Sequence, residues 1–282
     1  MKKRMASKDF NISDLPSNRK EVFFDCLKNR YKYLLFSGLI LFLTIIPLIV
    51  IYFLKSIYLG ILVENFRNGA MSENEYSQAT LIQVLMFDSF VILSSFIASI
   101  GISGATRVIR QVGWIEPVFF FKDFSDGIKM NYKYISFHLF ILSTIYMISD
   151  LSTYSDLGIM FINYIPMGIF IFVAIPMVLY NIAEANIYNI SLLESLKNSF
   201  LFLIRSVHIS LLFSLGILGV MLLRLIPNII IVMMIYIILV IFVLPIYYLL
   251  WFLYSSYMFD KFININNYPE IVDKGITRKG IK

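Results

Sequence analysis

Long stretches without a single charged side chain are the feature that most limits how this chain can fold. A run of eighteen or more such residues is long enough to cross the hydrocarbon core of a bilayer as an α-helix. Four runs reach this length: Tyr33–Leu54, Leu157–Ala183, Ser206–Leu223 and Leu225–Phe259. Only 15% of the residues are charged, against about 25% in soluble domains. The chain is therefore predicted to be an integral membrane protein built of helices.

Two further apolar runs each contain one acid, Asp88 and Asp150. The last charge-free run is too long for one span at about 1.5 Å per residue, so a turn is expected near Pro227. We therefore predict an all-α bundle of six transmembrane spans within a domain at 21–258, between a flexible basic tail at 1–20 and a basic tail at 259–282. The expected spans, numbered one to six, are residues 33–54, 80–105, 134–149, 158–180, 206–223 and 229–253.

One nine-residue pattern occurs three times, each time before a pair of spans. It reads acid, any residue, Leu or Ile, Lys, two residues of any kind, aromatic, any residue, aromatic. The copies are Asp25–Tyr33, Asp126–Tyr134 and Glu194–Phe202. A short amphipathic helix can lie in the headgroup region with its apolar face toward the lipid. We predict three repeats, each an amphipathic elbow helix that turns into a two-span hairpin.

The basic residues are divided unequally between the two predicted sides of the membrane. Of 24 Lys and Arg residues, all but Lys55, Arg67 and Arg224 fall on the side of the N-terminus. Cytoplasmic segments carry the excess of Lys and Arg in membrane proteins. Both termini are therefore predicted to be cytoplasmic, in a multi-pass protein of the cell membrane. Residues 55–78 are expected to form the longest polar connection on the outer side.

No sequence motif points to catalysis, a cofactor or a metal. Phosphate-binding, zinc-protease, redox-cysteine and nucleophile-elbow motifs are absent. The segment Gly101–Gly104 has two glycines, but it lies in an apolar run and is better explained by helix packing. Two histidines, His138 and His208, are too few for a metal site without further ligands. We predict that the protein is not an enzyme and binds no cofactor and no metal.

Asp88 is the one ionisable residue expected clearly inside a span. Ionisable side chains within a membrane are candidates for function, so Asp88 is a candidate polar site. It lies about two turns from the outer end of span two, and three interpretations stay open. It could pair with Lys55 or Arg67, it could line a small outer cavity, or it could be exposed to water near the interface.

Two spans carry stripes of small residues at helical spacing. Such stripes allow the backbones of two helices to approach closely. The serines concerned are Ser95, Ser99 and Ser103 in span two, and Ser206, Ser210 and Ser214 in span five. We expect spans two and five to pack tightly against each other at the centre of the bundle.

Basic and aromatic residues recur in the predicted cytoplasmic elbows and links, where a partner protein or the membrane lipids would meet them. Each Lys or Arg near an anionic lipid surface adds about 1 kcal/mol of attraction, and nucleic acid is not expected as a partner. The candidate docking residues are Lys28, Lys32, Arg107, Arg110, Trp114, Phe120, Phe121, Lys129, Lys133 and Lys197.

Two classes of function are compatible with these features. One is an accessory or interaction subunit that binds other membrane-protein subunits, and the other is a solute transporter or channel in its own right. Transporters commonly place polar groups and broken helices at the middle of the membrane, in inverted repeats. The uncharged middle of the predicted bundle and its parallel repeats therefore favour the subunit.

Four segments carry a resemblance to a known family. They are Lys28–Leu35 (KNRYKYLL), Gly101–Ala105 (GISGA), Phe120–Tyr132 (FFKDFSDGIKMNY) and Leu196–Arg205 (LKNSFLFLIR). On these residues the chain resembles the YesL-like family of bacterial integral membrane proteins over most of 22–255. Family members are shorter, so 55–78 looks like an expansion, and they have a Gly-Pro pair where Ile102 follows Gly101 here.

The resemblance implies a role beside a carbohydrate-uptake transporter system, and it makes an ABC-type transporter a candidate partner. It carries over no catalytic residue. The role that it implies is at most an accessory one.

Overall fold

The computed structural model describes residues 15–155, 160–226 and 228–276. The predicted all-α class is confirmed for this part of the chain, which contains no β-strand. In order, the elements are α1 (Arg19–Asn29), α2 (Tyr31–Arg67), α3 (Glu73–Gly113), α4 (Phe120–Tyr154), α5 (Met160–Ile169), η2 (Phe170–Ala174), α6 (Ile175–Ala185), α7 (Leu192–Arg205), α8 (Val207–Gly219), η3 (Val220–Leu225), α9 (Ile229–Ile238), η4 (Leu239–Val243), α10 (Leu244–Phe259), η5 (Asp260–Asn264), α11 (Ile265–Asn267) and η6 (Pro269–Ile271).

Five continuous helices in the described residues are long and apolar enough to cross a membrane. They are Tyr31–Arg67, Glu73–Gly113, Phe120–Tyr154, Phe161–Ala185 and Ile230–Asn267. A sixth span arises if α7 and α8, which are bent by 102° at the break between them, are counted as one. These five or six apolar helices make the chain a multi-pass membrane protein, as the sequence predicted.

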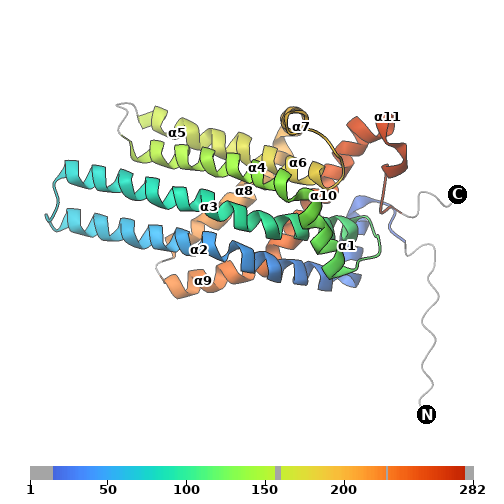
Figure 1. The fold of residues 1–282 in the computed structure, drawn as a ribbon, viewed down its shortest axis with the longest axis horizontal. Coiled ribbons are helices and arrows are strands. Elements are labelled where there is room, and N and C mark those ends of the chain that lie inside the picture. Colours follow the sequence, from blue (N-terminus) through green and yellow to red (C-terminus); the bar gives the residue numbers. More distant parts are fainter. Residues whose placement is uncertain (1–14, 156–159, 227, 277–282) are drawn as a thin grey trace, which may run out of the picture.

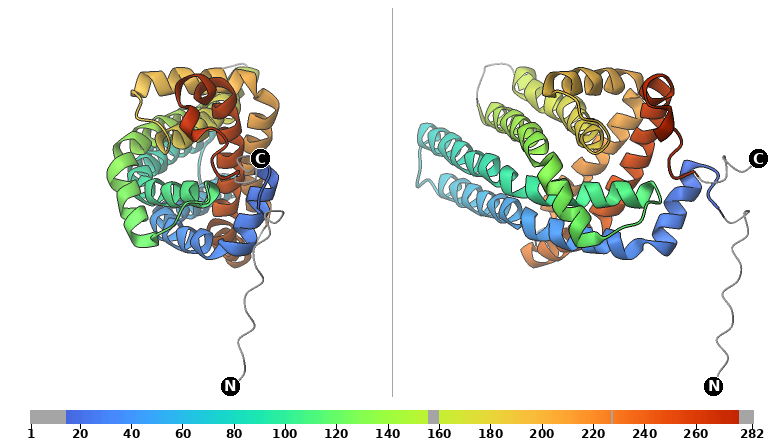
Figure 2. Two further views of the ribbon diagram at one scale, coloured as in Figure 1. Left: turned by 90° about the vertical axis from the view of Figure 1, so that its right-hand side faces the viewer. Right: turned by 45° about the vertical axis from the view of Figure 1, so that its right-hand side comes forward.

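Helices α2 and α3 form a long antiparallel hairpin, and α3 is packed between α2 and α4 (Figure 1). Helix α4 pairs with α5, and α6 packs against α7. Helix α10 passes along the other side of α3 and also contacts α1, α2 and α6 (Figure 2). Three of its large aromatic side chains, Trp251, Phe252 and Phe259, are fully buried. The last long helix therefore forms much of the core.

The first and last described segments meet at one end of the bundle. This end, at the right of Figure 1, holds α1, α7, α11 and the α3–α4 connection, whereas the α2–α3 turn lies at the opposite end. Arg19 in α1 forms an ion pair with Asp260 at 2.7 Å and donates to the carbonyl of Lys274 at 2.6 Å. Both ends of the described chain therefore lie on one side of the bundle. Their cytoplasmic location remains a prediction from the charges.

Most of the predicted polar connection at 55–78 is helical. Helix α2 runs on to Arg67 and α3 begins at Glu73, which leaves only residues 68–72 for the turn. The stacked rings of Phe66 and Tyr76, with centroids 4.8 Å apart, join the two arms. Because α2 and α3 pack against each other here, both helices continue into the polar residues beyond their apolar segments.

The three predicted elbows are not equivalent. The first breaks at Arg30, where φ is −127°. The third breaks at Ser206, four residues after its motif ends, and Figure 1 shows α7 almost end-on, across the other helices. The middle copy has no break, because α4 is continuous. There the helix is held against α3: a Cβ added at Gly127 would lie 2.7 Å from the carbonyl oxygen of Ser103. The separate elbow helix predicted before span three was therefore wrong.

All six serines of the two small stripes are buried, but the stripes do not pack on each other. Helix α8 lies against α6, α7 and η2, whereas α3 lies against α2, α4 and α10. Ser206 meets Tyr180 of α6, with 2.5 Å between the hydroxyl oxygens. In α3, a Cβ added at Gly101 would lie 1.9 Å from Oγ1 of Thr44 in α2. The expected contact between spans two and five was wrong, because α8 leaves the bend at Ser206 along α6 instead.

Candidate functional site

Three charged side chains from three neighbouring helices meet inside the bundle. The Nζ atom of Lys55 in α2 lies 2.5 Å from Oδ1 of Asp88 in α3, and Lys55 also forms an ion pair with Asp150 in α4. Asp88 is fully buried, while the side chains of Lys55 and Asp150 are 8% and 14% exposed. We refer to Lys55, Asp88 and Asp150 as the charged triad.

The three residues of the charged triad lie at similar depths along the bundle axis, because they are at similar distances along their helices from the same end of the bundle. Lys55 and Asp88 lie on the two arms of the α2–α3 hairpin, at similar distances from its turn. Along α2, α3 and α4, roughly twenty residues separate the triad from basic residues at the other end of the bundle, which are Lys32, Arg107 and Lys133. At about 1.5 Å per residue this is about 30 Å, the thickness of a hydrocarbon core. The triad therefore lies near one boundary of the apolar layer.

The outer surface of the bundle is apolar at the level of the charged triad. Leu54, Met86 and Ile148, each one or two residues from a triad member, are 42%, 42% and 52% exposed. An ion in such surroundings is costly unless it is paired. The structure pairs Asp88 with Lys55, and the burial of Asp88 excludes the alternative of a water-exposed carboxylate. Arg67, the other partner considered, is exposed at the far end of α2.

The charged triad holds two carboxylates and one ammonium group, so its fully ionised form carries one excess negative charge. The ring of Tyr146 lies beside the ammonium, with 5.6 Å from Nζ of Lys55 to the ring centroid. The Oδ2 atom of Asp88 is buried and accepts no hydrogen bond from the described residues. A buried acceptor without a donor costs about 1–3 kcal/mol, and more if it is charged. The triad is therefore short of one donor.

A small cavity lies one helical turn inward from the charged triad. Its volume is about 190 Å³, and residues from α2, α3, α4 and η2 line it. The polar groups in the wall are the side chains of Ser95, Ser143 and Tyr146, and the rest of the lining is apolar. Asp88 is not in the wall, but Val91 and Ser95, on the same side of α3, are. Tyr146 thus lies between the triad and the cavity.

A second buried polar cluster lies nearer the opposite end, between α4, α6 and α7. Glu184 and Asn181 in α6 are fully buried. The Oγ atom of Ser195 in α7 lies 2.8 Å from Oε2 of Glu184 and 2.6 Å from Oδ1 of Asn181. Glu184 takes part in none of the ion pairs found among the described residues. The middle of the bundle thus lies between two buried layers that carry acidic residues.

The two histidines lie apart and in different surroundings. His138 is buried in α4, with Nδ1 2.8 Å from the carbonyl oxygen of Tyr134. His208 is exposed on α8. In the described part of the chain, no group of three or more His, Cys, Asp or Glu side chains could hold a metal ion.

The candidate docking residues differ in exposure. Phe121 and five lysines are exposed, and Arg107 and Phe120 are half-buried. Those lysines are Lys28, Lys32, Lys129, Lys133 and Lys197. Arg110 and Trp114 are buried at 8% and 7% exposure. These two residues do not reach the surface, and their assignment as docking residues was wrong.

Arg110 and Trp114 instead hold the C-terminal segment against the end of α3. The guanidinium carbon of Arg110 and the Nζ atom of Lys274 each lie 4.5 Å from the centroid of the Trp114 ring. Glu116 bridges the two cations, at 3.0 Å from Arg110 and 2.9 Å from Lys274. Cations over an aromatic face are attracted by its quadrupole. Sequence reasoning missed this contact because Lys274 lies in the predicted basic tail, 160 residues beyond Trp114.

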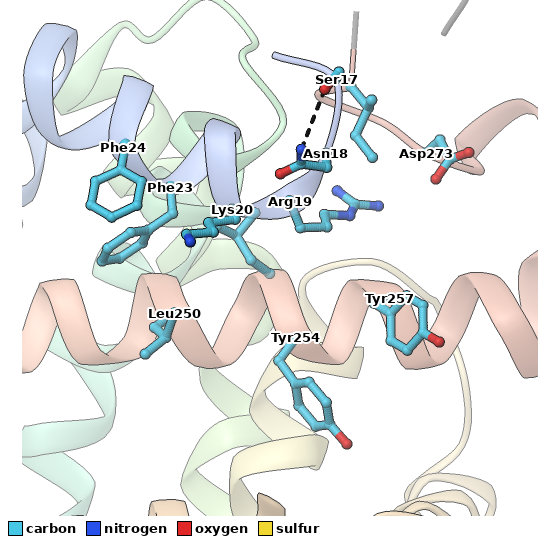
Figure 3. A pocket seen from close by; sticks show the side chains of 12 residues that line it. Ser17, Asn18, Arg19, Lys20, Phe23, Phe24, Leu250, Tyr254, Tyr257 and Asp273 are labelled. Carbon is cyan, nitrogen blue, oxygen red and sulfur yellow. Dashed lines mark hydrogen bonds between the residues drawn. The ribbon is translucent and has the colours of Figure 1, made fainter.

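A groove of about 720 Å³ lies between α1 and α10 at the same end of the bundle. Figure 3 shows Phe23, Phe24 and Lys20 of α1 on one side, and Leu250, Tyr254 and Tyr257 of α10 on the other. Its lining is mainly apolar. Arg19, at its edge, is already paired with Asp260. The groove therefore combines a second basic side chain, Lys20, with a wall of aromatic and aliphatic side chains.

Comparison of the chain with models of known protein families, with curated proteins and with solved structures finds no match. The resemblance to the YesL-like family therefore remains a prediction from the four sequence segments.

Asp150 and Tyr146 are the parts of the site that sequence reasoning missed. Asp150 was recognised only as a single acid in an apolar run. One signal was present: Asp150 is 17 residues beyond Lys133, and Asp88 is 19 residues before Arg107. Similar distances from the basic end of two antiparallel helices place both carboxylates at one level of the membrane.

Proposed function

We propose that the protein is a non-enzymatic accessory or interaction subunit of a membrane complex. It would lie in the cell membrane with both termini in the cytoplasm, and its partner would be a transporter system for carbohydrate or another solute. The observation that carries this proposal is an exposed basic and aromatic surface on α4. The partner class rests on the YesL-like resemblance.

Every fourth residue along one side of α4 is exposed. This α4 stripe consists of Phe121, Ser125, Lys129, Lys133 and Phe137. A hollow of about 380 Å³ adjoins it, with walls formed by Phe96, Phe137 and Phe140 and with Lys133 at its edge. Aromatic side chains around a hollow, next to a cation, are a composition found at protein interfaces. A partner helix with an acidic residue at the membrane boundary and an apolar side chain below it would fit this surface.

Purification of the tagged protein from its native membrane would test the proposal. We expect partner subunits to co-purify in a fixed ratio, and the double variant Lys129→Glu, Lys133→Glu to lose them, since charge reversal in an interface costs several kcal/mol. Arg67→Glu reverses an exposed charge at the other end of the bundle and should leave the complex intact.

Two results would count against the subunit. The first is that the protein purifies alone. The second is that the double variant keeps the same partners in the same ratio. If the double variant only weakens binding to anionic lipid vesicles, the α4 stripe seats the bundle in the membrane and does not bind a subunit.

A second candidate, a solute transporter or channel in its own right, is favoured by the charged triad. Buried ionisable residues in membrane helices often mark ion or substrate pathways, and the 190 Å³ cavity adjoins this one. Solute uptake into vesicles that contain only this protein, and its loss with Asp88→Asn, would support the transporter. Vesicles that take up no solute above protein-free controls would argue against it.

A further inference from the structure

We propose that the charged triad is a proton-binding site, in which Asp88 and Asp150 share one exchangeable proton beside Lys55. This inference is independent of whether the protein acts as a subunit or as a transporter. Three observations carry it: the charge balance, the unpartnered carboxylate oxygen of Asp88 and the partial exposure of Asp150.

The charge balance calls for one more positive charge. Among the described residues, Lys55 is the only cation that forms an ion pair with Asp88 or Asp150. Its ammonium group sits in hydrogen-bonding distance of both Asp88 and Asp150. It thus occupies the position between the carboxylates that a metal cation would take. Two carboxylates that share a site do not ionise together easily, and one of them is protonated more readily than usual. A single proton on the pair leaves one ammonium and one carboxylate, which is a neutral site.

The buried Oδ2 atom of Asp88 gives an independent reason. It accepts no hydrogen bond from the described residues, and Asp88 is 0% exposed. An ionised carboxylate with one oxygen left without a donor is strongly disfavoured in a low-dielectric interior. Protonation removes that charge and turns one carboxyl oxygen into a donor. The hydroxyl then formed can donate to the remaining carboxylate.

Other titratable groups that face the triad do not supply the missing charge. Tyr146 lies beside Lys55, and the titratable groups that act on Tyr146 besides the two carboxylates are Tyr52 and Tyr154. A tyrosine is neutral or, if ionised, negative. Helix α5 packs on α4 near this level through uncharged groups: Ser149 donates to the carbonyl of Pro166. No neighbouring element among the described residues therefore adds a second cation, which leaves the proton as the compensating charge.

The proton can be exchanged because the two carboxylates differ in access. The Asp150 side chain is 14% exposed and lies toward the end of α4. Asp88 is closed to solvent and lies one turn from the cavity wall at Val91 and Ser95. The step is a simple equilibrium: a hydronium ion gives its proton to one carboxylate, so that one O–H bond forms, one O–H bond of the hydronium ion breaks and a water molecule is left, with no change of oxidation state. Asp150 receives the proton and shares it with Asp88.

Infrared spectroscopy of the purified, reconstituted protein tests the proposal, because a protonated carboxyl group has a carbonyl band separate from that of a carboxylate. Spectra are recorded across a pH series with circular dichroism as a check on the fold. We expect a protonated-carboxyl band that is still present at neutral pH, above the range in which exposed carboxyl groups titrate, and that disappears at higher pH. Glu184 is also buried with one carboxyl oxygen that accepts no hydrogen bond from the described residues, so the band is compared in the Glu184→Gln background. There it should be lost on adding Asp88→Asn or Asp150→Asn, because each variant leaves Lys55 with a single, ionised carboxylate.

Two control variants make the assignment specific. Glu64→Gln removes an exposed carboxyl group from the same arm of α2, and Glu184→Gln alone removes a fully buried one from α6. Both should keep the pH-dependent band. Should one aspartate variant fail to fold, the other decides. A folded protein without such a band at neutral pH in the Glu184→Gln background would overturn the proposal, and so would a band that does not titrate or that survives in both aspartate variants made in that background.

Discussion

The Nζ atom of Lys55 lies 2.5 Å from Oδ1 of Asp88, so a cation on α2 is held against a carboxylate on α3 within the apolar layer of the bundle. A third helix joins the pair, because Asp150 of α4 binds the same ammonium group. Whatever its chemical role, the charged triad ties three helices together. Its removal therefore has structural consequences that can be measured separately.

Lys55→Met is expected to destabilise the protein by about 3–5 kcal/mol, because it leaves two buried carboxylates without a cation. Asp88→Asn should cost much less, since the pair Lys55–Asp150 stays intact. Thermal unfolding in detergent would measure both. Arg67→Met, at an exposed position of α2, should change stability by no more than about 0.5 kcal/mol. Equal losses for Lys55→Met and Arg67→Met would contradict a stabilising triad.

Gly38→Ala is expected to destabilise the contact between α2 and η4. The added Cβ would lie 1.9 Å from the carbonyl oxygen of Ile241, a backbone atom that cannot move aside without the helix. Overpacking of this kind costs about 1–3 kcal/mol. Gly60→Ala, on the same helix, meets nothing within 4 Å and should instead stabilise by about 0.5–1 kcal/mol. Unfolding temperatures that shift in the same direction for both variants would disprove the close approach.

Ser99→Leu should destabilise the protein, whereas Ser89→Leu should be tolerated. Both serines lie on α3, but Ser99 is fully buried and Ser89 is exposed. A leucine at Ser99 would have to push a neighbouring helix away, at a cost of about 1–3 kcal/mol. The yield of folded protein after extraction and its unfolding temperature compare the two variants. If both are tolerated equally, tight packing along this stripe is not supported.

Hydropathy located the helices well, because a chain in lipid must satisfy its backbone groups within helices. Residues 33–54 and 80–105 indeed lie inside α2 and α3. Hydropathy could not show that the polar residues after Lys55 continue α2, because there the partner arm of the hairpin stabilises the helix. Outside the lipid, the residue at which a helix ends depends on tertiary contacts, and these cannot be read from the local sequence.

The site was predictable only in part, and for the same reason. Asp88 and its possible partner Lys55 were recognised as ionisable residues near a span boundary. The inclusion of Asp150 depends on which side of α4 faces α3, and that is set by close contacts such as Gly127 against Ser103. The Trp114 ring is covered in part by Lys274, which lies 160 residues further along the chain. Neither relationship follows from spacing within one helix.

Cys26 is expected to react very slowly with thiol reagents in the folded protein. Its side chain is fully buried, and Sγ lies 3.3 Å from the carbonyl oxygen of Val112, to which it donates. Burial raises the pKa of the Cys26 thiol to about 12, so the reactive thiolate is scarce at neutral pH. Maleimide labelling before and after denaturation would measure this. Complete labelling of the folded protein at pH 7 would contradict the packing of α1 on the end of α3.

Because Cys26 is expected to be unreactive, membrane topology can be tested with introduced cysteines while Cys26 stays in place. Ser125 and Asn68 are exposed at opposite ends of the bundle, in α4 and in the α2–α3 turn. With the basic end in the cytoplasm, Ser125→Cys should resist a membrane-impermeant maleimide in intact cells and react after the membrane is opened. Asn68→Cys should react in intact cells. The reverse pattern would place the α4 stripe outside the cell, and the predicted orientation, together with a cytoplasmic docking surface, would be wrong.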